Sequence, residues 1–189
     1  QYYRTLVNED ATPIKRKNLF LNYHTKLKYE TLNKRYFPTK GLKTNISYTI
    51  HTDLHTNTAY SSLATQITKI FPIALNTFII PTIYGRFIFN DGIPFMYSNV
   101  IGGEGYNPHY EQQIPFSGLP HTESTLKLLG NARIQIRHKF HGKQYLTLSG
   151  NYAIHQNQFS NFLQGKKIYG TSIGYGYDSP LGPIEGFIC

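Results

Sequence analysis

The chain has 189 residues, which suits one domain or a large part of one, and it contains no apolar run of the roughly 20 residues that a membrane-spanning helix needs. Its formal net charge of +9 comes from basic residues spread along the chain, and because no nucleic-acid-binding motif accompanies them, we expect no nucleic-acid partner. Charged residues make up only 15% of the chain, Tyr and Phe supply all of its aromatics, and Cys189, the single cysteine, cannot form an internal disulfide.

Alternation of apolar and polar residues predicts β-strands along most of the chain, whereas helical periodicity is scarce. In residues 42–51, for example, Leu42, Ile46 and Ile50 alternate with polar neighbours. Because no connection requires a parallel crossover, we expect an antiparallel meander. The predicted strands, in chain order, are residues 2–8, 18–31, 42–51, 60–71, 76–90, 133–140, 144–154, 168–178 and 183–189.

The predicted connections alternate between tight turns and longer loops. Tight turns are expected after Phe71–Pro72, at His141–Lys143 and at Ser179–Pro183. Longer loops are expected at residues 9–17, 91–131 and 155–167.

Strand length separates two architectures. The clear strands run about ten to thirteen residues, longer than the five or six of a soluble sandwich and close to the 9 to 11 of a tilted transmembrane strand. Together with the loop alternation and the Tyr/Phe excess, this favours an all-β, antiparallel up-and-down transmembrane barrel, with apolar side chains facing lipid and polar side chains facing the lumen. A soluble all-β binding module with a tyrosine-rich face remains an alternative, because the same alternation suits a solvated sheet.

Three blocks resemble the bacterial surface-antigen barrels, a superfamily that includes the outer-membrane insertase and the two-partner secretion transporters. Asn33–Ile50, NKRYFPTKGLKTNISYTI, resembles their Phe-Pro-Thr-x-Gly turn and strand. Ile93–Gly118 resembles their long in-folded loop, and Tyr169–Phe187 resembles their penultimate hairpin. The motif residues that this resemblance identifies are Phe37, Pro38, Thr39, Gly41, Gly102, Gly103, Gln112, Gln113, Pro115, Phe116, Pro180, Leu181, Gly182 and Pro183.

The resemblance implies that residues 1–189 are about the second half of a barrel of about sixteen strands in the bacterial outer membrane. The Phe-Pro-Thr-Lys-Gly turn would lie at the periplasmic rim, and the loop at 91–131 would start from the outer rim. The implied partners are outer-membrane lipid and lipopolysaccharide, the remaining barrel strands and an N-terminal domain of the same protein, with a homodimer as a further arrangement. Because an open sheet edge in hydrocarbon leaves backbone groups unpaired, we expect additional strands outside this segment.

One branch of the superfamily is especially similar. Glu111–Phe116 resembles a run in the patatin-like phospholipases of Bacteroidetes, which carry such a barrel after the hydrolase domain. The implied function is a non-catalytic barrel that anchors that domain, or serves in translocation. The alternative is the barrel of an insertase or secretion transporter. However, the Arg-Gly loop tip of the family is absent from Tyr106–Tyr110, and Ala132–Arg137, which should supply a facing acid, contains none.

No catalytic motif is visible, so we leave open whether the whole protein is an enzyme and expect no cofactor. Ser117 and Ser149 lack the Gly-x-Ser-x-Gly pattern, so a hydrolase would have its catalytic residues elsewhere. His51 and His55 lack a third metal ligand and are better interpreted as solvated loop residues. The glycines of Gly102–Gly105 favour a turn over a phosphate loop.

Two features concern the barrel wall. Gly170, Gly174 and Gly176 share one strand face, where they either admit a close neighbour or curve the strand. Tyrosines near predicted strand ends are expected at the membrane interface, with half-buried strand tyrosines as the alternative. These tyrosines are Tyr60, Tyr84, Tyr97, Tyr145 and Tyr169.

Overall fold

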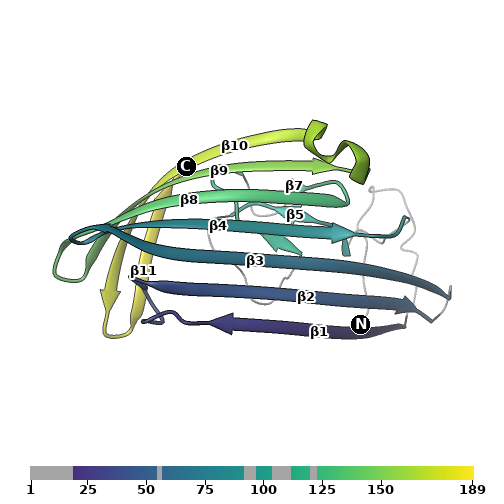
Figure 1. Ribbon diagram of the computed structural model, residues 1–189, viewed down its shortest axis with the longest axis horizontal. Helices are drawn as coiled ribbons and strands as arrows, with labels where there is room; N and C mark the ends of the chain where they lie inside the picture. Colours follow the sequence, from purple (N-terminus) through teal and green to yellow (C-terminus); the bar gives the residue numbers. More distant parts are fainter. Residues whose placement is uncertain (1–18, 55–56, 92–96, 104–111, 120–122) are drawn as a thin grey trace, which may run out of the picture.

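The main body of the protein is one curved, eight-stranded antiparallel sheet (Figure 1). The computed structural model describes residues 19–54, 57–91, 97–103, 112–119 and 123–189. Each strand pairs with its neighbours in the order β1-β2-β3-β4-β8-β9-β10-β11, which confirms the predicted all-β, up-and-down half-barrel. The strands are β1 (Phe20–Glu30), β2 (Gly41–Asp53), β3 (Thr58–Ala74), β4 (Thr77–Ile88), β8 (Leu128–His141), β9 (Gln144–Gln156), β10 (Lys166–Ser179) and β11 (Gly182–Ile188).

The observed strands agree with the predicted ones to within a few residues, and the candidate at 2–8 lies outside the described residues. The tight turn predicted from Phe71–Pro72 onward is present, but it begins a few residues later, at residues 75–76. β3 continues through Pro72, which lies opposite Phe78 at a register shift, and the chain reverses after Ala74. Asn76 in that turn has φ +64°, a left-handed conformation that asparagine tolerates better than most residues.

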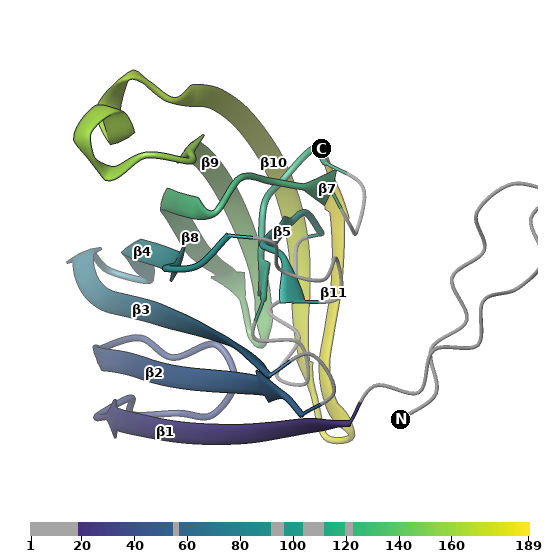
Figure 2. The same cartoon turned by 90° about the vertical axis from the view of Figure 1, so that its right-hand side faces the viewer.

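The connection between β4 and β8 contains three short strands that form a second sheet. They are β5 (Val100–Ile101), β6 (Gln113–Ile114) and β7 (Glu123–Ser124), with β5 parallel to β6 and antiparallel to β7. Viewed along the strands, this small sheet lies within the curve of the large one (Figure 2). The described parts of the predicted loop at 91–131 therefore fold inward, and β8 begins at Leu128, inside the range assigned to the loop.

The connections form two rims. The turn rim holds the connections at 31–40, 75–76, 142–143 and 180–181, and the loop rim holds those at 54–57, 89–127 and 157–165. The last of these includes a 3-10 helix, η2 (Phe159–Gln164), which the sequence pattern did not predict.

The outer face of the sheet is apolar and uncovered by a second layer. The strand register aligns Ile67 with Ile83, and Ile136 with Leu148, on this face. Ile83 is 61% exposed and Leu148 is 55% exposed. A soluble sandwich would bury these side chains between two layers, so the structure contradicts that arrangement for the residues it describes.

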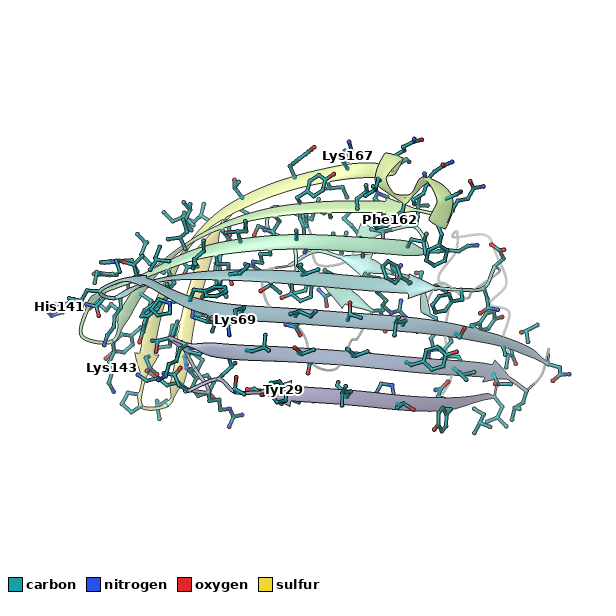
Figure 3. The ribbon with its side chains drawn as sticks, viewed as in Figure 1. Tyr29, Lys69, His141, Lys143, Phe162 and Lys167 are labelled. Atoms are coloured by element: carbon teal, nitrogen blue, oxygen red, sulfur yellow. The ribbon has the colours of Figure 1, made fainter. Side chains whose placement is uncertain are left out.

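The opposite face is polar, and the charged residues of the strands separate almost completely between the two faces. Within the described strands of the large sheet, the register places every acidic residue and every Lys or Arg on the inner face except Lys69 and Lys167. These two lie on β3 and β10, towards opposite rims (Figure 3). Such a division is what a strand crossing between lipid and an aqueous lumen requires.

Candidate functional site

The inner face of the sheet is covered by the in-folded segment, which we define as the described residues between 97 and 127. Three of its apolar side chains, Ile101, Ile114 and Phe116, are almost completely buried. They pack into one cluster with Tyr84, Leu129 and Ala153 of the wall. Burial of a large apolar side chain contributes about 1.5–3 kcal/mol, so this cluster holds the segment firmly inside the curve.

A buried arginine on the wall holds the two ends of the segment. Arg86 of β4 donates through Nη1 to the Asn99 side-chain oxygen at 2.6 Å and to the Tyr97 carbonyl at 3.1 Å. The Asn99 amide group donates in turn to the carbonyls of Leu126 at 2.9 Å and Lys127 at 2.7 Å. Asn99 thus joins the start of the segment, its end and the wall in one network.

This network exchanges the positions of the basic group and its acceptor relative to the contact that the family resemblance implies, in which an arginine of the loop faces an acid of the wall. The arginine lies on the wall, at Arg86, and the acceptor lies in the segment, at Asn99. The stretch Tyr106–Tyr110, where the family's arginine would stand, lies outside the described residues. The sequence analysis did not find Arg86, although an arginine on the lumen-facing side of a strand was a usable signal.

A second attachment lies on β9 and β10. The buried Ser117 hydroxyl accepts a hydrogen bond from Asn151 Nδ2 at 2.7 Å and lies 3.0 Å from the Ser172 hydroxyl. Beside it, a Cβ added to Gly170 would lie 2.0 Å from the Ser117 carbonyl oxygen. Gly170 therefore admits the segment to the wall, as one of the two interpretations of these glycines predicted.

The Gly-Gly step directly follows β5, in the small sheet of the in-folded segment. Gly102 and Gly103 have φ of +135° and +75°, conformations that favour glycine. The Gly103 carbonyl accepts from the Phe116 amide at 2.8 Å, and Gln113 Nε2 donates to the Gly102 carbonyl at 3.0 Å. Pro115 presents its carbonyl to Asn131 Nδ2 of the wall at 3.0 Å, and the carbonyl of Gln112 accepts from Val100. The motif residues of this block therefore shape and dock the segment.

The Phe-Pro-Thr-Lys-Gly turn is fixed by the side chain of Asn33. Asn33 Oδ1 accepts from the amides of Thr39 at 3.0 Å and Lys40 at 3.2 Å, and its Nδ2 donates to the Thr39 hydroxyl at 2.8 Å. Gly41 has φ +126°, and a Cβ there would lie 2.5 Å from the Thr31 carbonyl oxygen. The turn consequently requires glycine at this position, after the φ-restricted Pro38.

Phe37 of this turn is buried against the opposite part of the sheet. Its ring stacks on Tyr145 of β9, and the guanidinium of Arg137 lies 5.3 Å from its ring centroid. A Cβ added to Gly176 would lie 2.7 Å from the ring, so this glycine makes room for Phe37. The ring thereby links the connection between β1 and β2 to β8, β9 and β10.

The third motif block is the tight turn between β10 and β11. The Ser179 hydroxyl donates to the Gly182 carbonyl at 2.6 Å and accepts from the Leu181 amide at 3.2 Å. Pro180 and Leu181 form the turn, and Pro183 pairs with Asp178 at the start of β11. This block lies at the turn rim and makes no contact that would join it to the in-folded segment in a common site.

The prediction for the interface tyrosines is wrong at three positions on the wall. Tyr60, Tyr84 and Tyr145 face inward and are buried, and Tyr97 lies in the in-folded segment, where its ring is 4.1 Å from that of His51. Tyr169 alone among the five is exposed on the outer face, at 72%.

The outer aromatic residues are instead found at both rims on the face that carries Ile83. Their ring contacts include Phe140 with Tyr175 near the turn rim and Tyr152 with Tyr169 nearer the loop rim. Aromatic side chains therefore lie towards both rims of the outer face, and of the five predicted tyrosines only Tyr169 is among them.

Only one histidine of the candidate pair at His51 and His55 lies among the described residues. His51 Nδ1 lies 2.8 Å from Asn22 Oδ1, and His55 is outside the described residues. Across the described ranges, no group of three or more His, Cys, Asp or Glu side chains could hold a metal ion.

A small cleft remains between the segment and strands β1 to β4. Its volume is about 20 Å³, close to what one water molecule requires. Lys26, Gln66, Arg86 and Gln113 contribute to its lining, and none of the lining residues is acidic. Gln113 and Ile114 are the residues of the in-folded segment that line this cleft.

A curved antiparallel sheet with an apolar outer face, a polar inner face and an in-folded segment defines a half-barrel of the outer-membrane type. The sequence model of one family, described as the OMP85 superfamily, matches residues 3–188, and the chain belongs to this superfamily of outer-membrane proteins. No curated protein matches the chain significantly. Among the described residues, no helix is long and apolar enough to cross a membrane.

Proposed function

We propose that this half-barrel is a non-catalytic membrane anchor for a partner domain of the patatin-like phospholipase type, which it positions at the outer membrane. The observation that carries the anchoring role is the docking of the in-folded segment. Two networks, at Asn99 and at Ser117, and a buried apolar cluster fix it to the wall. A lumen filled in this way suits a static anchor better than an open channel.

The identity of the partner domain rests on the resemblance of Glu111–Phe116 to the phospholipase branch. The described part of that run has a structural role. Gln113 and Pro115 make hydrogen bonds within the docked segment and to the wall, and Phe116 is fully buried. We expect ester hydrolysis to reside in a domain outside residues 1–189.

The test uses the full-length protein. We expect it to fractionate with the outer membrane and to release fatty acid from a diacyl phospholipid, and we expect the protein without its partner domain to fractionate in the same way but to release none. A control replaces Ser160, an exposed serine of η2 outside both docking networks, with alanine and should leave the activity unchanged. Full-length protein that inserts but hydrolyses no phospholipid would contradict the phospholipase assignment.

A second candidate is the barrel of an insertase or secretion transporter, which membership of the OMP85 superfamily favours. It requires a row of small periplasmic adaptor domains upstream instead of a hydrolase. Depletion of the protein should then reduce the amount of other folded β-barrels, or of one secreted substrate, in the cell envelope. Under the anchor proposal, depletion leaves both unchanged.

A further inference from the structure

Beside the loop rim, the connection between β9 and β10 folds onto the outer face of the wall. Figure 2 shows η2 on the side of the wall away from β5 and β7. Its Phe162 ring covers Gly130 of β8, where an added Cβ would lie 3.1 Å from the ring, and Ile154 of β9, which pairs with Gly130 on this face, is buried. The connection therefore packs against the surface that carries the apolar residues.

Four phenylalanine rings continue this contact and form what we call the outer shelf, together with Leu163. The ring centroid of Phe87 lies 6.0 Å from those of Phe159 and Phe162, and the Phe159 ring stacks on the Phe89 ring with 6.1 Å between their centroids. Three members of the shelf remain exposed, since the exposed fraction is 49% for Phe89, 59% for Phe159 and 80% for Leu163. Apolar side chains this exposed are costly in water but suit acyl chains.

Two lysines follow the residues of η2 in the sequence. Lys166 and Lys167 begin β10, and both are exposed. The register pairs Lys166 with His155 on the inner face and Lys167 with Ile154 on the outer face, so only Lys167 lies beside the shelf (Figure 3). Residues 157–169 contain no acidic residue. An apolar shelf bordered by an outward-facing lysine and by Tyr169 matches a molecule with acyl chains below and a phosphate group above.

We propose that the outer shelf with Lys167 binds a phosphorylated, acylated lipid of the membrane leaflet at the loop rim. The acyl chains lie along Phe159 and Leu163, and the phosphate lies against Lys167. This rests on the proposed function only in that the sheet spans a membrane; it does not depend on the identity of the partner domain.

The chain contains a matched control for this site. Lys69 is the other outward-facing lysine of the strands, and its Nζ lies 5.6 Å from the centroid of the Phe71 ring. It lies on β3 towards the turn rim, away from the outer shelf, and has exposed apolar neighbours of its own in Phe71 and Ile73. A general attraction of any outer-face lysine to anionic lipid would affect Lys69 and Lys167 equally.

The experiment measures lipid binding to the full-length protein in detergent, with diphosphorylated lipid A and its dephosphorylated form as probes. We expect the protein to prefer the phosphorylated lipid, and K167A to lose about fivefold in affinity. K166A, at the inward-facing neighbour, should keep the affinity. K69A should keep the preference. F159S/L163S should weaken binding of both lipids, and K167R should restore most of the affinity lost in K167A.

Three outcomes overturn the proposal: no preference for the phosphorylated lipid, an equal loss in K69A, or competition by millimolar inorganic phosphate that displaces the lipid completely. Heat-modifiable electrophoretic migration reports whether each variant retains the folded barrel. A full-length protein that folds and inserts but shows no preference contradicts only the lipid site, whereas failure to insert contradicts the proposed function as well.

Discussion

Phe37, in the turn between β1 and β2, stacks on Tyr145 of β9 with ring centroids 4.2 Å apart and ring planes within 4°. The two residues are separated by most of the half-barrel along the sheet, so their contact fixes the curvature at the turn rim. We expect F37A to lower the free energy of unfolding by about 3–5 kcal/mol, because a buried phenyl ring is lost.

The interaction energy of the two rings is measured by a double-mutant cycle. The free energies of unfolding of F37A, Y145A and the double variant are measured with urea in phospholipid vesicles and compared. A coupling of about 0.5–1.5 kcal/mol is expected for a stacked aromatic pair. L181A, at a fully exposed turn residue of the same rim, serves as the control and should change little. Additive effects of the two variants would show that the rings do not interact.

Gly41 and Gly142 form a matched pair of glycines with positive φ. G41A forces a Cβ against the Thr31 carbonyl at φ +126°, so a loss of more than about 1 kcal/mol in the free energy of unfolding is expected. G142N should be nearly neutral, because φ is +50° and nothing lies within 4 Å of the added Cβ. Equal destabilisation by both substitutions would contradict the steric role of Gly41.

Gly170 controls the docking of the in-folded segment. In G170A the new methyl group overlaps the Ser117 carbonyl, so we expect the segment to detach from β10 and the lumen to become more permeable. The measurement is uptake of a large antibiotic by cells that produce the full-length protein. G150A on β9, where nothing lies within 4 Å of the added Cβ, should leave uptake unchanged, and equal uptake by both variants would refute the docking role.

The outer face should reject charge in the middle of the membrane. I83K places an ammonium group in the apolar belt and should cost about 2–4 kcal/mol and reduce insertion into vesicles. L181K introduces the same charge in an exposed turn beyond the belt and should insert normally. In a protein whose outer face met water, I83K would be as harmless as L181K.

The sequence predicted the strands well because alternation is a local property of each strand. It also predicted the close approach at Gly170, since a glycine on the inner face admits a neighbour. It failed for the tyrosines because they were assigned by distance from a strand end and not by strand parity. Tyr145, for example, is one residue out of phase with Leu146 and Leu148, and so faces inward.

The contacts that hold the in-folded segment could not be derived from local patterns. Asn99 and Ser117 are short polar residues in irregular backbone, and their partners, Arg86 and Asn151, lie on different strands of the wall. Only the register of the sheet brings these groups together. The position of η2 on the outer face has the same origin, since Phe162 finds its contact at Gly130 on β8.

The two outward lysines also set how deeply the protein sits in its bilayer. Lys69 and Lys167 mark the two limits of the apolar band on the outer face. In a bilayer whose hydrocarbon core is thicker than this band, one of the two ammonium groups would lie in hydrocarbon. Thickness mismatch would then tilt the half-barrel or thin the lipid around it. The spacing of the two lysines therefore sets the hydrocarbon thickness that suits the protein best, and membranes of unequal thickness should retain it to different extents.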